Sequence, residues 1–241
     1  MFHSISTEFM SRKGSYTDDQ LRYWFDLFNN FFVKTLENQT NKDFSVFVEI
    51  QDEMPDDRLK FMFERCKQLN WKIGRRHELI KHIKSKWNDN DFIISSRLDC
   101  DDLIHSECVS DIQNFAHTVT RPVVYGYDNC LLLDGTTNKY YRVPCRFQRS
   151  QMQSIIYNTS ISSSDKFFLP HNWDNSCPLD SIPEKDVTLF TDHTKDAAVW
   201  HRHPKATLWN RFTPDNSQLA SIHPKAIMTR FGTVPYDSTL G

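Results

Sequence analysis

Strand-like and helix-like segments alternate along the N-terminal part of the chain. The stretch Phe2–Phe9 alternates apolar with small polar residues, which is typical of a strand. From Asp18 the apolar residues recur at the i, i+3, i+4, i+7 spacing of an amphipathic helix, and residues 44–50 are almost continuously β-branched or aromatic. A strand, a helix and a second strand in this order predict a βαβ unit, whose two strands run parallel.

The alternation continues into a third strand. Pro55 begins a second helical pattern, since proline fits the first turn of a helix, and a further helical pattern covers residues 78–87. Residues 91–96 contain an apolar Phe-Ile-Ile core and predict a buried, central parallel strand. Residues 106–119 are again helical in pattern, so the N-terminal half is predicted to be α/β.

The second half has a different pattern. Short strands are predicted at 123–127, 129–133 and 139–143, the last two joined by a turn at Asp134 and Gly135. Beyond about residue 146 the periodicities weaken, and we expect irregular loops with one helix near residues 149–157. The sequence therefore predicts a mixed, mostly parallel sheet flanked by helices, with a loop-rich C-terminal part.

Charge, cysteines and hydropathy exclude several classes of protein. The 29 Lys and Arg against 31 Asp and Glu give a formal charge of -2, which provides no global basic field for non-specific nucleic-acid binding. The 6 cysteines form no zinc-ligand spacing, and no apolar run approaches the ~20 residues of a membrane span. With no signal-like apolar segment near the first residue, we expect reduced thiols and a cytoplasmic location.

Three carboxylates follow the predicted central strand directly. Asp99, Asp101 and Asp102 lie within four residues, at the carboxyl end of a strand, where ligands bind in open parallel sheets. Because clustered carboxylates repel one another, a divalent cation such as Mg²⁺ or Mn²⁺ would stabilise them. A solvated loop, an N-terminal cap of the next helix and a Ca²⁺ site are the alternatives.

Several short blocks, read in order, resemble the rhamnosyltransferase-like family of GT-A glycosyltransferases. Residues 96–102 (SRLDCDD) resemble the family's Arg-Leu-Asp-x-Asp-Asp motif, its version of the DxD signature, and residues 198–203 (AVWHRH) resemble its late Trp-x-x-x-His block. Further blocks of the resemblance are 3–10 (HSISTEFM), 22–40 with its terminal Gln-Thr pair, and 44–55. The sequence departs from the family at Glu8, where arginine is common, and in the Arg-His-Pro after His201, where glycine is more usual.

The resemblance implies a GT-A fold for a single domain, 1–241. Its nucleotide-binding α/β half would span 1–120, and its acceptor-side half with a C-terminal extension would span 121–241. The resemblance also implies a nucleotide-sugar donor (a UDP-, GDP- or dTDP-sugar) and Mn²⁺ or Mg²⁺. Such an ion stabilises the negative charge that grows on the departing diphosphate.

Roles for individual residues follow from this resemblance. Asp101, Asp102 and His201 are the predicted metal ligands, with His203 as the second choice of histidine. Predicted nucleotide contacts are Thr7, Arg97, Asp99 and Asp101. An inverting transferase needs a carboxylate base, and the candidates in the second half are Asp174, Asp192 and Asp196.

Several functions remain open at this point. The leading hypothesis is metal-dependent transfer of a hexose or deoxyhexose, with rhamnose as one candidate, to a saccharide or other hydroxyl acceptor. A second is glycosylation of a modified DNA base, favoured only by a basic helix face (Arg75, Arg76, His77, Lys81, Lys84, Lys86) that is more typical of a solvated helix. A third is a non-catalytic nucleotide-sugar binding module. A nucleotidyltransferase or phosphatase is disfavoured because no glycine-rich phosphate loop or nucleophile motif is present.

Overall fold

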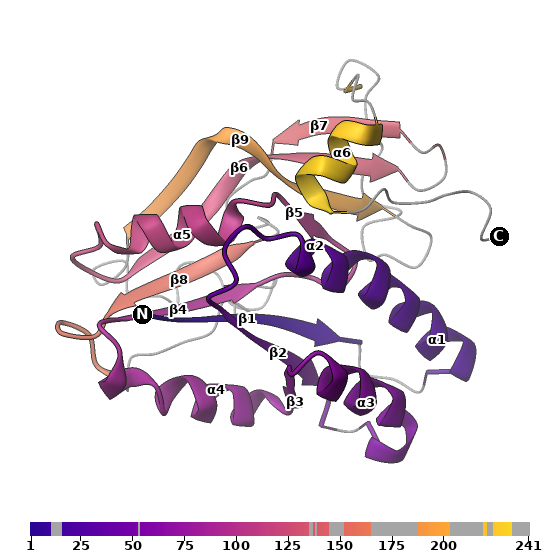
Figure 1. Cartoon of the computed structure of the whole chain (residues 1–241), viewed down its shortest axis with the longest axis horizontal. Helices are drawn as coiled ribbons and strands as arrows, with labels where there is room; N and C mark the ends of the chain where they lie inside the picture. Colours follow the sequence, from indigo (N-terminus) through magenta and orange to yellow (C-terminus); the bar gives the residue numbers. More distant parts are fainter. Residues whose placement is uncertain are drawn as a thin grey trace.

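The chain forms one mixed β-sheet with helices against it (Figure 1). The computed structural model describes residues 1–10, 16–52, 54–134, 137, 139–144, 152–164, 188–202, 219–220 and 224–232. Along the last long strand it describes the backbone and the Val199 side chain. The described strands are β1 (Phe2–Phe9), β2 (Ser45–Ile50), β3 (Lys72–Gly74), β4 (Phe92–Arg97), β5 (Leu103–Ile104), β6 (Val123–Asp134), β7 (Lys139–Pro144), β8 (Gln153–Asn158) and β9 (Thr188–Arg202).

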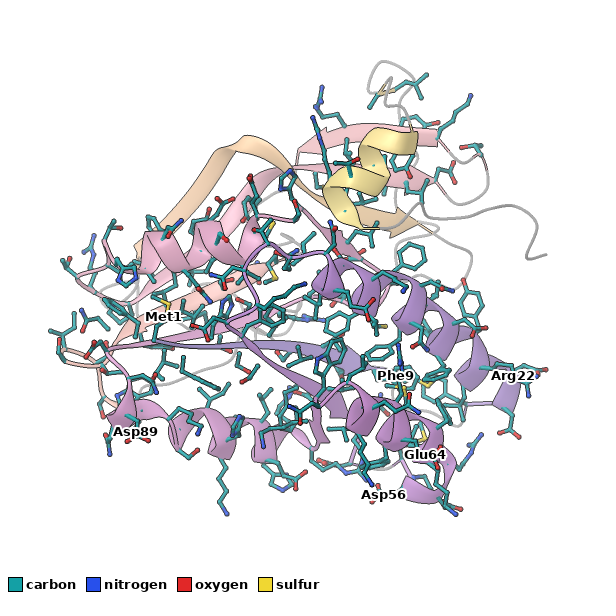
Figure 2. The ribbon with its side chains drawn as sticks, in the orientation of Figure 1. Met1, Phe9, Arg22, Asp56, Glu64 and Asp89 are labelled. Atoms are coloured by element: carbon teal, nitrogen blue, oxygen red, sulfur yellow. The ribbon has the colours of Figure 1, made fainter. Side chains whose placement is uncertain are left out.

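The N-terminal half of the sheet is parallel, as the alternating pattern predicts. The sheet order is β3-β2-β1-β4-β8-β6-β9-β5, with β7 paired to β6. Parallel pairing joins β1 to β2, β1 to β4 and β2 to β3, so the carboxyl ends of these four strands share one edge. Figure 2 shows Phe9 at the end of β1 on the same side of the molecule as Asp56, with Met1 and Asp89 at the opposite side.

The helices connect these strands and cover the sheet. They are α1 (Asp18–Leu27), the π-helical turn η1 (Phe28–Val33), α2 (Lys34–Glu37), η2 (Asp56–Leu59), α3 (Lys60–Gln68), α4 (Arg76–Lys84), η3 (Trp87–Asp89), α5 (Cys108–Ala116) and α6 (Pro224–Phe231). The predicted helix from Asp18 is confirmed, and a capping box between Thr17 and Gln20 begins it. Its apolar face buries Phe28 and Phe32 against the sheet, where the Phe28 ring packs edge-on against Phe9 at a centroid distance of 6.2 Å.

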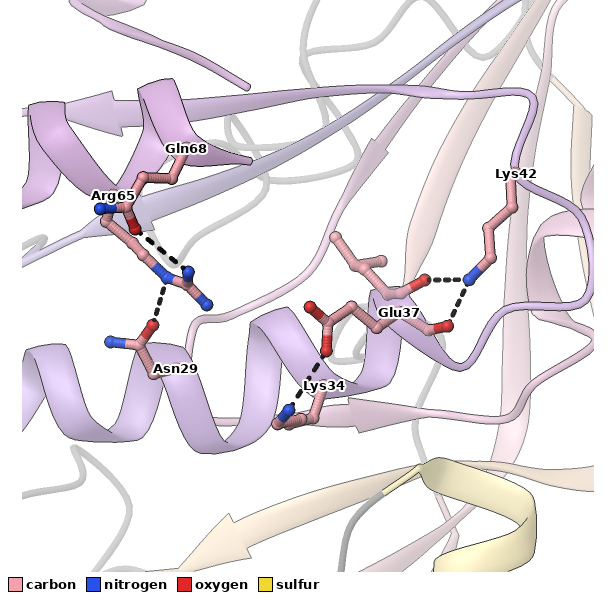
Figure 3. A network of polar contacts seen from close by, with 7 residues as sticks. Asn29, Lys34, Glu37, Lys42, Arg65 and Gln68 are labelled. Carbon is pink, nitrogen blue, oxygen red and sulfur yellow. Dashed lines mark hydrogen bonds and ion pairs between the residues drawn. The ribbon is translucent and has the colours of Figure 1, made fainter. Parts of the chain in front are cut away.

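Polar side chains fasten the ends of these helices (Figure 3). The Lys42 ammonium donates to the carbonyl of Leu36 at 3.1 Å and to that of Glu37, which satisfies carbonyls left open where α2 ends. The Arg65 guanidinium of α3 donates to the Asn29 side chain at 2.8 Å, so α3 is joined to the first helix. The Lys42 bonds therefore close the end of α2, and the Arg65 bond fixes how α3 lies against the first helix.

The second half differs from the sequence-based expectation in three respects. The strands predicted at 123–127 and 129–133 are one strand, β6. The helix expected near residues 149–157 is wrong, because Gln153–Asn158 is strand β8, antiparallel to both β4 and β6. Ile155, Ile156 and Tyr157 are buried there, and successive side chains of a strand between two neighbours are covered on opposite faces. The third difference is that β9 and α6 occupy parts of the region expected to be loops.

Cysteine chemistry also differs from expectation. Cys66, Cys100 and Cys108 are free and buried, as reduced thiols would be. Cys130 on β6 is disulfide-bonded, and its partner lies outside the described residues. Among the described helices, none combines the length and the apolar character needed to cross a membrane.

Candidate active site at the carboxyl edge of the parallel strands

The acidic cluster is a tight turn anchored in the core. Directly after β4, the Leu98 amide donates to the carbonyl of Ser6 at 3.0 Å, and the Leu98 side chain is fully buried. The Asp102 amide then donates to the carbonyl of Asp99 at 3.2 Å, which closes the turn. Leu98, Cys100 and Asp102 are all buried, so alternate residues of the turn face inward. The turn therefore lies at the carboxyl edge of the parallel strands, directly after β4.

The carboxylates of this turn differ in exposure. Asp102 is 2% exposed, whereas the Asp99 side chain is 51% exposed. Burial raises the pKa of the Cys100 thiol well above its usual value, and the carboxylates of Asp101, Asp99 and Asp102 raise it further, so the thiol is neutral at pH 7. Arg97, the last residue of β4, pairs with Asp99 at 3.0 Å. Arg97 and Asp99 thus form a charged pair that faces solvent at the strand end.

A second charged group lies beside the first. Glu8 of β1 and Glu49 of β2 are partners in the parallel register, so their side chains lie on the same face of the sheet. Arg76 at the start of α4 donates to Glu49 at 2.8 Å and lies 3.9 Å from a carboxylate oxygen of Glu8. Burial raises the pKa of Glu49, and the nearby Glu8 carboxylate raises it further. The positive charges of Arg76 and Arg97 act in the opposite direction and lower this pKa.

The two groups together carry excess negative charge. The carboxylates are Glu8, Glu49, Asp99, Asp101 and Asp102, and the guanidinium groups beside them are Arg76 and Arg97. A diphosphate approaching these carboxylates would be repelled unless a cation came with it.

The first helix holds the chain that follows the acidic turn. The Thr35 hydroxyl of α2 donates to the carbonyl of Ile104 at 2.8 Å and accepts from the Ile104 amide at 2.9 Å. The Gln39 side-chain amide donates to the carbonyl of His105 at 2.9 Å, and the Thr40 backbone amide donates to the carbonyl of Ser106 at 2.8 Å. Thr35 therefore fixes β5, and the Gln-Thr pair noted in the sequence fixes the segment that follows β5.

Strand β9 brings the backbone of His201 toward the acidic turn. Leu103, the residue after Asp102, pairs with Val199 in antiparallel register, and His201 lies two residues beyond Val199. In an antiparallel pair this direction leads back along the acidic turn. The predicted metal ligand is thus on the strand that adjoins the cluster, although its side chain is outside the described ones.

The predicted catalytic bases are spread more widely. Asp192 and Asp196 lie on β9, in register with Tyr127 and Asn129 of β6. Register shifts in β9 make the stretch from Asp192 to His201 only as long as the stretch from Tyr127 to Leu133 of β6, which is roughly 20 Å at ~3.3 Å per residue. Asp174 and His203 lie outside the described residues. The backbone therefore places Asp192 far from the acidic turn, and Asp196 at an intermediate distance.

Thr7 is placed differently from the other predicted nucleotide contacts. Its side chain is fully buried on β1, and its hydroxyl has no hydrogen-bond partner.

The described residues fit a divalent cation only in part. They contain no group of three His, Cys, Asp or Glu side chains arranged to hold a metal ion. Mg²⁺ binds in many enzymes through one or two carboxylates, with phosphate and water oxygens completing its coordination. Asp101 and Asp102 satisfy that requirement by their oxygen chemistry, and His201 would add a ligand from β9.

Three site-forming residues were missed by sequence reasoning. Glu49 stands at the end of an otherwise apolar strand, and a charge in such a strand was the signal that could have identified it. Arg75 and Arg76 were interpreted as part of a basic helix face, but Arg76 holds Glu49 and Arg75 holds the segment after β2. Their engagement in these bonds weakens the only sequence feature that favoured nucleic-acid binding.

The fold and the site together define a class of protein. A parallel half-sheet with acidic and arginine side chains gathered at its carboxyl edge defines an α/β protein, and α/β proteins of this kind generally bind ligands at that edge. The model of the family described as "Putative rhamnosyl transferase" matches residues 5–156, and the chain belongs to this family. The family match confirms the resemblance seen in the sequence, and the observed sheet with its flanking helices confirms the predicted α/β class of fold.

Similar solved structures have low sequence identity to this chain. The Staphylococcus aureus protein TarS 1-349 in complex with UDP-GlcNAc is 13% identical with a TM-score of 0.47, and the match covers 88% of this chain and 62% of that one. A putative nucleotide-diphospho-sugar transferase from Desulfovibrio desulfuricans G20 is 12% identical with a TM-score of 0.42, covering 83% of this chain and 82% of that one. A cytidylyltransferase from Leptospira borgpetersenii is 15% identical with a TM-score of 0.41, covering 79% and 75%. No curated protein matches the chain significantly.

Proposed function

We propose that this protein is a metal-dependent glycosyltransferase that moves a sugar from a nucleotide-sugar donor to a hydroxyl acceptor. The observation that carries the proposal is the acidic turn after β4, held at the carboxyl edge in a chain of the rhamnosyl transferase family. The sugar is a hexose or deoxyhexose, and the family's name favours rhamnose. The proposal includes a single domain over 1–241, with donor binding in 1–120 and acceptor binding in 121–241.

The excess of carboxylates supports the metal dependence. Asp101 and Asp102, with His201 from β9, would hold Mn²⁺ or Mg²⁺, and the ion would supply Lewis-acid stabilisation of the departing diphosphate. Arg97 is placed to bind a phosphate oxygen in exchange for Asp99, since a guanidinium holds either anion with two hydrogen bonds. Asp99, released from Arg97, would then accept a hydrogen bond from a ribose hydroxyl.

The acceptor hydroxyl needs a base, and Asp174, Asp192 and Asp196 remain the candidates. Because β9 carries Asp192 further from the acidic turn than Asp196, we rank Asp196 ahead of Asp192. Asp192→Asn is therefore a useful comparison for Asp196→Asn and Asp174→Asn in transfer assays.

Ligand-induced stabilisation tests the donor site. Thermal unfolding is measured with the UDP, GDP and dTDP series of nucleotides and nucleotide sugars, each with Mn²⁺ or with chelator. At a hundred times its Kd, a ligand of the folded state raises the free energy of unfolding by about 2.7 kcal/mol. We expect one nucleotide series to stabilise the protein, and we expect chelator to remove most of that effect.

Asp101→Asn should abolish the metal-dependent stabilisation while leaving the ligand-free melting temperature nearly unchanged. The matched control is Asp91→Asn, since Asp91 is an exposed aspartate just before β4, at the opposite edge of the sheet. A shift that persists in Asp101→Asn, or that is equally reduced in Asp91→Asn, would contradict the assigned site. Stabilisation by a donor with no sugar release or transfer would favour the non-catalytic binding module.

A further inference from the structure

The segments that follow three neighbouring strands are linked by the side chains of Arg75 and Gln51. Arg75 is the residue between β3 and α4, where it precedes the first turn of the helix. Its guanidinium donates to the carbonyl of Gln51, donates to that of Met54 at 3.0 Å, and pairs with Asp56 at 2.8 Å. All three acceptors belong to the segment that follows β2. A single side chain therefore determines the shape of that segment.

A second link runs from this segment to the end of β1. The Gln51 side-chain amide donates to the carbonyl of Met10, the first residue after β1. Met10 is buried and has a φ of 65°, in the left-handed region that non-glycine residues rarely adopt. Such a conformation persists only where the surrounding structure holds it, and these conformations are concentrated at functional sites.

A third contact fastens the far end of the connection between β1 and α1. Arg58 of η2, in the same segment, donates to the carbonyl of Tyr16 at 2.7 Å and pairs with Asp18 at 2.8 Å. The segment after β2 thus holds the chain at Met10 and again at Tyr16. Arg75 in turn holds that segment, so the contacts at Met10 and Tyr16 both depend on Arg75.

We propose that Arg75 and Gln51 are positioning residues that fix the carboxyl-edge segments for donor binding. The inference rests on the proposed function, because the donor is what those segments would bind. Arg75 adjoins Arg76, which holds Glu49 and Glu8, so both arginines act on the same edge of the sheet. A site held in its bound geometry before the ligand arrives binds more tightly than one that must order first.

We call the bonds that Arg75 and Gln51 make to these segments the clamp. Amide hydrogen exchange of the ligand-free protein tests whether the clamp exists. In Arg75→Met, which keeps the stem and removes the guanidinium, exchange should rise in peptides that contain residues 51–56 and in those that end at Met10. In Gln51→Met it should rise chiefly at Met10. The control is Arg65→Met, since the Arg65 guanidinium bonds Asn29 of the first helix and Gln68 of its own helix, α3 (Figure 3). Arg65→Met should leave both segments unchanged.

Affinity for the stabilising nucleotide, measured by calorimetry, tests the positioning role. We expect about tenfold weaker binding in Arg75→Met and wild-type affinity in Arg65→Met. Arg75→Lys should recover only part of the affinity, since an ammonium lacks the planar fork that serves several acceptors. Unchanged exchange at Met10 in both clamp variants would overturn the clamp, and loosened segments with wild-type affinity would overturn its positioning role. If the wild type binds no nucleotide, the proposed function fails and the positioning role falls with it, while exchange still reports whether the clamp exists.

Discussion

His3 is the centre of a buried polar chain across the middle of the sheet. Its Nε2 lies 2.7 Å from the Ser96 hydroxyl, which lies 2.6 Å from that of Ser154. The Gln113 amide lies 3.4 Å from His3 Nδ1 and also donates to the carbonyl of Asp43. Nδ1 therefore accepts, and Nε2 carries the proton that it donates to Ser96. Burial lowers the pKa of His3 to about 3, so the ring stays neutral in the folded protein.

This depressed pKa predicts a loss of stability in acid. Above pH 6.5 His3 is neutral in both the folded and the unfolded states, and its contribution is fully present. Between about pH 6.5 and about 3 only the unfolded chain takes up the proton, so the free energy of unfolding falls with pH. At pH 5 the loss is about 2 kcal/mol relative to pH 7.5.

Urea unfolding of the wild type and His3→Gln over this pH range measures that contribution. His3→Gln should flatten the slope of stability against pH, because the amide does not titrate. His77→Gln, at an exposed position on α4, is the matched control and should keep the wild-type slope. An equal slope in wild type and His3→Gln would show that other groups cause the acid sensitivity.

At the scale of elements, the contact between α2 and β5 depends on a single hydroxyl. Thr35 is fully buried and satisfies both the amide and the carbonyl of Ile104. Thr35→Val keeps the side-chain shape but leaves both backbone groups without a partner, so we expect the free energy of unfolding to fall by about 2 kcal/mol. Because β5 follows the acidic turn, donor affinity should fall as well.

Denaturant unfolding of Thr35→Val, together with nucleotide titration, checks this expectation. Thr118→Val is the control, since its hydroxyl donates to the carbonyl of Phe115 at an exposed helix end. The control should change stability by less than about 0.5 kcal/mol. A similar loss in both variants would mean that the bond to β5 has no special weight.

At the scale of the whole molecule, α6 joins the C-terminal part of the chain to the first helix. Ile227 and Phe231 are fully buried in a cluster with Leu27, Phe31 and Leu103, and Figure 1 shows α6 over this part of the fold. The Ser106 amide donates to the carbonyl of Arg230 at 2.8 Å. The helix lies outside the residues matched by the family model, yet it completes the core beside the acidic turn.

Phe231→Ala should lower the free energy of unfolding by about 3 kcal/mol or more, because it removes a large aromatic ring from a packed cluster. Chemical denaturation of the intact chain measures this loss. Ile161→Ala is the comparison, since Ile161 is 57% exposed and also loses apolar volume. A loss in Phe231→Ala no greater than that in Ile161→Ala would contradict a core role for α6.

Sequence periodicity predicted the elements that have one clear face. The helix from Asp18 and the strands at β1, β2 and β4 are where the patterns place them, because each carries enough regularly spaced apolar residues. Strand β8 was mistaken for a helix because a short apolar run fits either period, and only the positions of β4 and β6 on its two sides decide it. The same limit applied to β9, whose partner strands are remote in the sequence.

What the sequence determined by itself is local: the βαβ alternation, and an acidic turn that follows its strand directly, since both depend on residues adjacent in the chain. The tertiary structure alone decided that Glu8, Glu49 and Arg76 meet, that Arg75 reaches the segment after β2, and that Gln51 reaches the end of β1. These residues come from separate strands and a helix, so their contacts exist only once parallel pairing has brought the strand ends to one edge. Only packing also decided that His3 stays neutral, because burial rather than any neighbour in the chain sets its pKa.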